Sequence, residues 1–242
     1  MQGKSGDVTR VLRDQSYLTW AIWAVLLIMA ADALIAGRFS VAFVALATLA
    51  LSLVPVIYAR WAEIHVPSSF MLLVVAFVGG TLFLGEVYDF YERFWWWDIA
   101  MHGASALGFG LIGFVLVFMM FQGNRFAAPH GAVAFFGFCF GMAIGVGWEI
   151  FEFGMDQLFG LNMQKSGLND TMGDLIVDFF GAGIGAMAGW AYLRGRHAAG
   201  LQRLIGEFIE KNPRLFQHQH QNRPGAQGKD TRQTELERND AD

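Results

Sequence analysis

The sequence predicts an all-α membrane protein, a six-helix transmembrane bundle with a short C-terminal amphipathic helix and a disordered tail. Of the 242 residues, 55% are hydrophobic and only 16% are charged, and the charges leave long apolar stretches between them. A helix needs about 20 apolar residues to cross the hydrocarbon core of a bilayer. Six stretches are of that kind: 17–37, 39–59, 68–88, 95–121, 129–156 and 170–193.

The first stretch is too long for the apolar region of a signal peptide, and a second span follows almost at once, so we expect it to be retained. The short joint around Gly37 and Arg38 predicts an antiparallel helical hairpin between the first two spans. The sequence shows no internal repeat, which makes 17–195 a single transmembrane domain. A net charge of −4 without a basic, aromatic-interleaved patch gives no indication of a nucleic-acid partner.

Lysine and arginine near the helix ends predict the orientation of the bundle. If segment 1–16 is cytoplasmic, the inner side carries eight basic residues and the outer side three, which favours an N-in/C-in topology. The inner residues are Lys4, Arg10, Arg13, Arg60, Arg125, Arg194, Arg196 and Arg203, and the outer residues are Arg38, Arg93 and Lys165.

Beyond the last span, apolar residues recur at helical spacing with charges between them, which predicts an amphipathic helix over 196–211 on the inner membrane surface. These residues are Leu201, Leu204, Ile205, Phe208 and Ile209. From Asn212 onward the chain is polar and has little to bury, so we expect 212–242 to be a disordered cytoplasmic tail.

Acidic residues gather at one end of the predicted bundle. In the hairpin topology, the carboxylates at the ends of spans three to six all fall on the outer side, and the inner ends of these spans carry none. Three spans present single acidic faces, because their residues lie three or four positions apart. The faces are Asp98 with His102, Glu149 with Glu152 and Asp156, and Asp170 with Asp174 and Asp178.

These faces are expected to turn inward and to need a counter-charge. An ionised carboxylate at the bilayer centre costs about 2.5–3.5 kcal/mol even on a lenient scale. Bound cations, protonation or water in an open cavity could offset this cost, and we favour cations. Carboxylate oxygens with one imidazole suit Mg²⁺, Mn²⁺, Ca²⁺ or Zn²⁺. The predicted ligands are Asp98, His102, Glu149, Glu152, Asp174 and Asp178, and His102 and Glu149 are also the candidate catalytic residues.

Other polar and small residues have plainer explanations. Asp156 and Asp170 lie at the interface, where solvated charge or helix capping is expected, and Asp170 suits an N-cap. Asp32 either joins the acidic cluster or pairs with Arg38. Glycines at every fourth position of spans five and six predict close contact between these two helices. They are Gly137, Gly141, Gly145, Gly181, Gly185 and Gly189.

Three strings carry a resemblance to a known family: WWWDIAMHGASALGFG, GWEIFEFGMD and GLNDTMGDLIVDFFGAGIGA. The chain resembles the bacterial inner-membrane YjdF-type family, a domain of unknown function, over roughly 17–193. More distantly, the layout of its last three spans is similar to VanZ-like membrane proteins, which have Asn where this chain has Asp178. The resemblance implies a bacterial inner-membrane protein and no particular chemistry.

Three functions fit these observations. The favoured one is a metal-dependent hydrolase or transferase that acts on a lipid-linked or phosphorylated substrate at the outer leaflet. A non-catalytic structural or interaction protein with a structural cation is the main alternative. A cation carrier ranks third, because the acidic residues lie at one membrane face rather than at the midplane.

Overall fold

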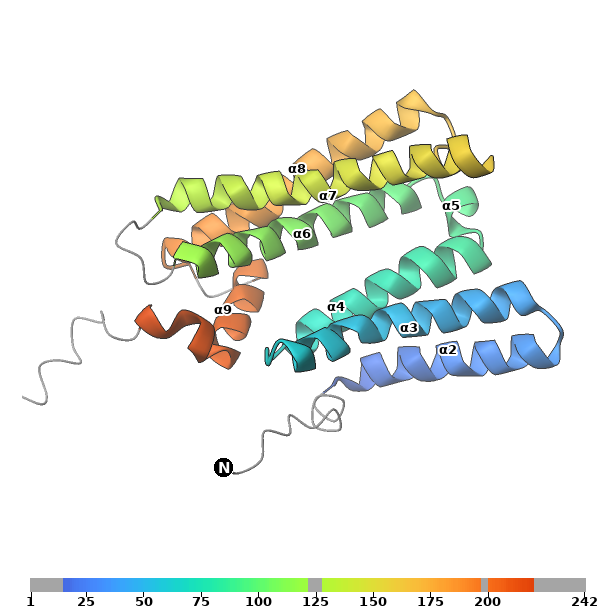
Figure 1. Ribbon diagram of the computed structural model, residues 1–242, viewed down its shortest axis with the longest axis horizontal. Coiled ribbons are helices and arrows are strands. Elements are labelled where there is room, and N and C mark those ends of the chain that lie inside the picture. Colours follow the sequence, from blue (N-terminus) through green and yellow to red (C-terminus); the bar gives the residue numbers. More distant parts are fainter. Residues whose placement is uncertain (1–14, 122–127, 197–199, 220–242) are drawn as a thin grey trace, which may run out of the picture.

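The computed structural model describes residues 15–121, 128–196 and 200–219, and among them helices account for all the regular secondary structure (Figure 1). The elements are α2 (Tyr17–Ile35), α3 (Phe39–Trp61), α4 (Ser68–Val78), the π-helix η1 (Gly79–Val87), α5 (Phe90–Arg93), α6 (Trp97–Phe121), α7 (His130–Phe159), α8 (Leu168–Leu193), α9 (Leu201–Lys211) and the 3₁₀ helix η2 (Pro213–Gln219). The predicted all-α class is confirmed.

Six of these helical segments are long and apolar enough to cross a membrane, with α4 and η1 forming one continuous span. The predicted six-helix bundle is therefore confirmed, and the bounds agree with the sequence to within a few residues. The main differences are that α7 extends to Phe159 and that the third span ends as a π-helix. Large apolar side chains such as Phe43, Phe180 and Met187 are exposed on the outer surfaces, as lipid-facing residues are.

The spans form two groups that lie side by side (Figure 1). Helices α2, α3 and α4 with η1 pack together, and α6, α7 and α8 make a second, tighter group. Short α5 lies at one end of the molecule, next to the start of α6, and α9 crosses the opposite end. The acidic helix termini belong to the α5 end of the second group.

Glycine allows the close packing of this second group. A Cβ atom on Gly181 of α8 would come within 2.7 Å of the Gly103 carbonyl oxygen on α6. One on Gly137 of α7 would lie 2.8 Å from the backbone nitrogen of Phe114, also on α6. The expected contact between spans five and six is present, but these glycines bring both helices against α6, which makes α6 the centre of the group.

The end of the chain differs from the expected disorder. Residues 212–219 are ordered, and Phe216 is buried against Phe118 of α6. The Asn212 amide donates to the His65 carbonyl over 2.8 Å and accepts from the His65 N–H over 2.7 Å. These contacts hold the first residues of the polar segment against α6 and the loop before α4. Residues 1–14 of the expected segment 1–16, residues 197–199 of 196–211 and residues 220–242 of 212–242 lie outside the described residues, and so do Lys4, Arg10, Arg13 and Arg125.

Candidate metal centre

His102 lies at the centre of a buried polar cluster formed by three helices. It stands one turn after Asp98 on α6, and it faces Glu149 of α7 together with Asp174 and Asp178 of α8. His102, Glu149, Asp174 and Asp178 are all buried, whereas the Asp98 side chain keeps 27% of its surface exposed. The three acidic helix faces thus meet around one imidazole.

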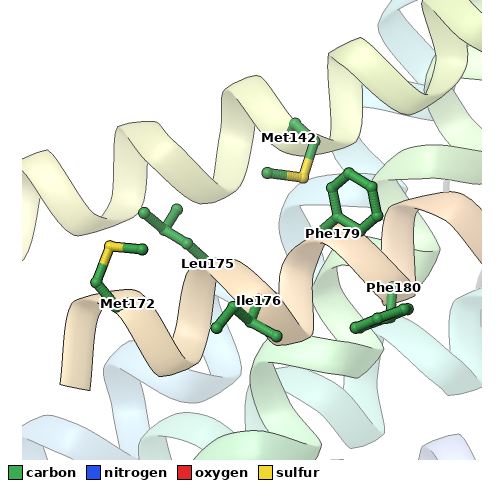
Figure 2. Close-up of a pocket in the computed structure, with 6 residues that line it drawn as sticks. All are labelled: Met142, Met172, Leu175, Ile176, Phe179 and Phe180. Atoms are coloured by element: carbon green, nitrogen blue, oxygen red, sulfur yellow. The ribbon is translucent and has the colours of Figure 1, made fainter. Parts of the chain in front are cut away.

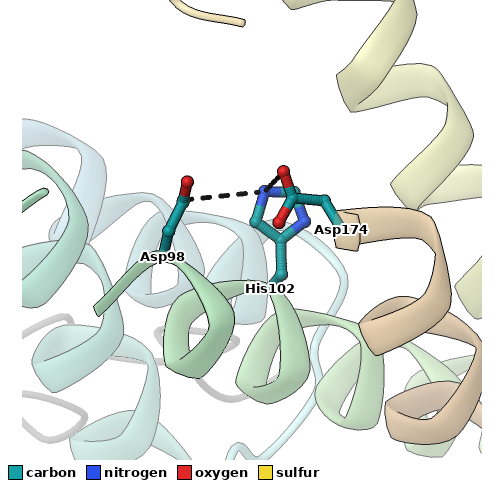
Figure 3. Close-up of side chains that lie close together, drawn as sticks. All are labelled: Asp98, His102 and Asp174. Carbon is teal, nitrogen blue, oxygen red and sulfur yellow. Dashed lines mark ion pairs between the residues drawn. The ribbon is translucent and has the colours of Figure 1, made fainter. Parts of the chain in front are cut away.

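The Nε2 atom of His102 faces three carboxylates. It lies 3.9 Å from Asp98 Oδ1, 4.0 Å from Glu149 Oε1 and 4.0 Å from Asp174 Oδ2. In Figure 3 the Asp98 carboxylate stands to one side of the imidazole and the Asp174 carboxylate overlaps the ring, and the dashed ion pairs from both meet at one ring nitrogen. These distances are too long for direct hydrogen bonds. They leave room for an ion or a water between the groups.

The separation of the ligand atoms suits a shared cation. One ligand atom each of Asp98, His102 and Asp174 can be chosen so that all three lie within 4.8 Å of one another. Protein ligands bind Zn²⁺ at about 2.0–2.2 Å and Ca²⁺ at about 2.3–2.6 Å, so two ligands of one ion are at most about 4–5 Å apart. This buried Asp–His–Asp cluster could therefore hold a metal ion.

Within the described residues, the ion pair of the other ring nitrogen is with Asp178. His102 Nδ1 lies 3.4 Å from Asp178 Oδ1, and the Asp178 side chain is only 1% exposed. The two nitrogens of an imidazole point in different directions, so a cation bound at Nε2 does not lie on the line to Asp178. Asp178 consequently occupies a different position from the three acids on the Nε2 side.

Two acids of the cluster are buried without hydrogen bonds. Within the described residues, neither oxygen of Glu149 and neither oxygen of Asp178 has a hydrogen-bond partner. Buried polar groups are paired in most proteins, because an unpaired one loses its hydration without replacement. These four oxygens are the features of the site that most require a positive partner.

Gly145 of α7 makes space for Asp178. A Cβ atom at this position would overlap the Asp178 carboxylate, so any larger residue would push the acid away from α7. The glycine interpreted from the sequence as a packing residue thus also shapes the cluster.

Glu152 is the predicted ligand that lies apart from the cluster centre. Its Oε1 accepts a hydrogen bond of 2.8 Å from the Trp148 indole N–H one turn earlier. Among the described residues, the ion pairs of His102 are with the other four acids and not with Glu152. The spacing of four residues between Trp148 and Glu152, one helical turn, is the sequence signal for this pair.

The remaining acids have local structural partners. Asp156 accepts from the backbone N–H groups of Met163 and Gln164 over 2.7 and 2.9 Å, and so fixes the loop after α7. The expected N-cap role of Asp170 is wrong, because Gly167 caps α8 and Asp170 lies in its first turn. The open question on Asp32 is settled, since it pairs with Arg38.

Tyr91 on α5 lies near the acidic residues at this end of the bundle, and the sequence did not indicate this. Burial raises the pKa of Tyr91, and the negative charge of Asp98 raises it further, so the hydroxyl keeps its proton at physiological pH. Its ring packs against Gly85 of η1. Lys165 of the α7–α8 loop donates to the Tyr91 carbonyl over 3.1 Å. Together they tie α5 to the acidic end of the bundle.

Comparison with known proteins gives a family and one relative. A family model described as "Predicted membrane protein (DUF2238)" matches residues 16–195. This match confirms the resemblance to a membrane-protein family of unknown function that the three sequence strings carry. An uncharacterized protein of Thermotoga maritima is 28% identical over 131 residues, which are 52% of this chain and 65% of the relative. The chain thus spans somewhat less than two thirds of that relative. No solved structure matches.

Proposed function

The chain belongs to the membrane-protein family described as "Predicted membrane protein (DUF2238)", and we propose that it binds a divalent cation between α6 and α8. Asp98, His102 and Asp174 are the proposed ligands, with the cation on the Nε2 side of the imidazole. The observation that carries this proposal is the meeting of their ligand atoms within 4.8 Å in a buried position. A cation there offsets the cost of burying these carboxylates in a membrane protein.

Glu149 and Asp178 have separate roles in this proposal. Glu149 Oε1 also faces Nε2, at 4.0 Å, so it serves as a further ligand or as a base beside the cation. We propose that, with the ion bound, the Nδ1–H group donates a hydrogen bond to Asp178, whose Oδ1 lies 3.4 Å away, and that this holds the imidazole with Nε2 toward the ion. Carboxylates beyond the ligand shell commonly orient metal-binding histidines in this way.

The donor set narrows the choice of ion. Two or three carboxylate oxygens with one imidazole nitrogen suit Mn²⁺ or Zn²⁺. Ca²⁺ and Mg²⁺ prefer sites made of oxygen alone, and Mg²⁺ usually keeps several waters. We infer Mn²⁺ or Zn²⁺ as the better-matched ions among the four that the sequence suggested.

The partly exposed Asp98 leaves one side of the site open, which suits a reaction better than a closed structural site. We propose hydrolysis or transfer of a phosphorylated or lipid-linked group. Glu149, which has no hydrogen bond among the described residues, would take the proton of the attacking water or hydroxyl. The oxygen of that nucleophile forms the new bond to phosphorus as the leaving-group oxygen departs.

We also propose that the site faces the periplasm from a bacterial inner membrane, in the N-in/C-in orientation. Arg60 in the last turn of α3 and Arg194 after α8 support this, because both lie at the helix ends away from the cluster. Basic residues near helix ends favour the cytoplasmic side.

Metal analysis of the detergent-purified protein tests the proposal. We expect about one equivalent of Mn²⁺ or Zn²⁺ in the wild type, consistent with one metal per site of this kind, and loss of the metal in D174N. The control is E92Q, which removes a carboxylate at the same end whose side chain is 75% exposed. A wild type that stays metal-free after loading contradicts the proposal. If the wild type does bind metal, phosphate release from phosphorylated lipids supports an enzyme, and cation uptake into liposomes supports a carrier.

A further inference from the structure

The chain passes from one group of helices to the other at one end of the molecule, through α5 (Figure 1). The first group contains α2, α3, α4 and η1, and the second contains α6, α7 and α8. At the opposite end, the segment 201–219, which forms α9 and η2, makes contacts with both groups. We propose that this segment is a clasp that holds the two groups together at the α9 end, and that its release lets them move apart there with α5 as the pivot.

The two groups share little packing with each other. Within the described residues, each cluster of buried apolar side chains lies in one group: those around Trp23 and Leu26 in the first, and the one around Phe114 in the second. Contacts of α6 with α4 and η1 are sparse, with Gly80 of η1 close to Met101 of α6. Lipid is as apolar as these side chains, so burial from water does not drive the groups together. Their relative position therefore depends on specific contacts at their ends.

The clasp is attached to the second group by apolar contacts. Ile205 of α9 and Phe216 of η2 are each 2% exposed and belong to the buried core of that group. The Phe216 ring stacks on Phe118 of α6 with 5.8 Å between the centroids. Burial of a whole apolar side chain outweighs the net contribution of one hydrogen bond. This attachment is consequently the firm one.

The clasp holds the first group through hydrogen bonds. Ser69 of α4 donates to Glu207 over 2.9 Å. Asn212 accepts from the His65 N–H over 2.7 Å and donates to the His65 carbonyl over 2.8 Å. The Glu207 side chain is 29% exposed, and water can replace a protein partner at such a position at little net cost. The hold on the first group can therefore open while the attachment to the second group stays.

The α5 end is joined by the chain itself. Phe90 of α5 packs edge to face on Trp97 of α6 with 4.9 Å between the ring centroids, and Tyr91 lies against Gly85 of η1. Lys165 of the α7–α8 loop donates to the Tyr91 carbonyl over 3.1 Å. Hinges in proteins are short connecting segments between packed units. A movement that opens the α9 end therefore pivots at α5.

The second group stays a unit when the clasp opens. Its glycines bring α7 and α8 directly against α6. The apolar groove in Figure 2 is lined by Met142 of α7 and five apolar side chains of α8, so it too belongs to this group alone. The residues of the candidate metal centre also lie within these three helices. A distance within the second group is thus a fixed reference for movement between the groups.

Double electron–electron resonance on the full chain in lipid nanodiscs tests the clasp. Spin labels are attached to pairs of introduced cysteines in a C139A background, because Cys139 is the one native cysteine. All labelled positions are exposed. The pairs connect the two groups at the α9 end, the two groups at the α5 end, and two helices of the second group: W61C–M120C, I35C–F159C and M120C–F135C.

The variant S69A/N212A removes both polar contacts with the first group and keeps the apolar attachment. We expect the W61C–M120C distance to lengthen and its distribution to broaden, while the other two pairs stay as in the parent protein. S69A alone should change the same distance by less. S68A/N169A replaces the same residue types at a neighbouring and an exposed position, and it should leave all three distances unchanged.

The three label pairs distinguish the clasp from a general loss of structure. An unchanged W61C–M120C distance in S69A/N212A overturns the clasp. A changed M120C–F135C distance in that variant also overturns it, because the second group would then not move as a unit. If I35C–F159C lengthens as much as W61C–M120C, α5 is not the pivot and the proposal fails. These outcomes do not depend on a bound ion.

Discussion

His102 and Asp178 face each other across the contact between α6 and α8, with 3.4 Å between Nδ1 and Oδ1. The opposite ring nitrogen faces the proposed ligands Asp98 and Asp174. In the proposed metal centre, one imidazole thus separates the proposed orienting acid from the acids proposed to hold the ion. Substitutions of Asp174 and Asp178, which look equivalent in the sequence, should therefore change the affinity for a metal ion by different amounts.

The first prediction concerns D178N. An asparagine keeps the shape of the side chain but holds the imidazole less firmly, so Mn²⁺ affinity should fall by about 10–100-fold. D174N, which removes a ligand, should lower the affinity further. Isothermal titration of the purified variants with Mn²⁺ measures both effects. Equal losses in the two variants would contradict the orienting role of Asp178, and so would an unchanged affinity in D178N.

The second prediction concerns Gly145. In G145A the new methyl group overlaps the Asp178 carboxylate, and overpacking of this kind lowers the free energy of unfolding by about 1–3 kcal/mol. Mn²⁺ binding should weaken as well, because Asp178 is displaced. G147A is the control on the same helix, since a Cβ at Gly147 meets nothing within 4 Å. In detergent, the free energy of unfolding of G147A should equal or exceed that of the wild type. Equal destabilisation of both variants would show that the Gly145–Asp178 contact is unimportant.

The sequence predicted the convergence of the acids better than their individual roles. The spacing of Asp98 with His102 and of Asp174 with Asp178 places each pair on one helix face, and those faces do meet. Residue spacing does not indicate which ring nitrogen of His102 faces which acid. The position of Asp178 on the Nδ1 side is therefore visible only in the three-dimensional structure. Glu152 shares a face with Glu149 only approximately, and the Trp148 indole one turn before it is a nearer partner.

The number of membrane-spanning helices was predictable because it depends on the length of the apolar segments. Six spans follow from hydropathy alone, because the bilayer requires backbone hydrogen bonds to be satisfied within each segment. The π-helical end of the third span lies where Tyr91 packs against Gly85, and the helical turn at 213–219 lies where Phe216 packs against Phe118. A local sequence pattern does not predict contacts between residues that are far apart in the chain.

The third prediction concerns the pH dependence of the α9 contact. Ser69 of α4 donates to Glu207 over 2.9 Å, and this hydrogen bond is the largest cause that lowers the pKa of Glu207 in the folded protein. The carboxylate therefore stabilises the fold above its unfolded pKa, and this contribution is lost as the pH falls through the folded pKa. In S69A the free energy of unfolding at neutral pH should fall by about 1 kcal/mol.

Unfolding of the wild type and S69A between neutral and acidic pH measures this effect. The difference between the two proteins should shrink as Glu207 becomes protonated. S68A on the neighbouring residue is the control. A difference that stays constant across the pH range would contradict the ionised Ser69–Glu207 contact.

The fourth prediction concerns Asn212, which links the end of α9 to the loop before α4. N212A removes hydrogen bonds to both backbone groups of His65 and to the Phe208 carbonyl. Because these groups are partly buried, the loss should cost about 1–3 kcal/mol of unfolding free energy. N169A, at an exposed position of α8, should change it little. Faster proteolysis after Lys211 in N212A, but not in N169A, is the expected readout.

The position of the ion itself is the central claim, and anomalous diffraction from crystals grown with Mn²⁺ measures it directly. We predict a peak on the Nε2 side of His102, within about 2–2.6 Å of oxygens from Asp98 and Asp174. Asp178 should remain on the Nδ1 side without contacting the peak. A saturating Mn²⁺ concentration that leaves this position without a peak, or a peak elsewhere in the bundle, would contradict the proposed metal centre.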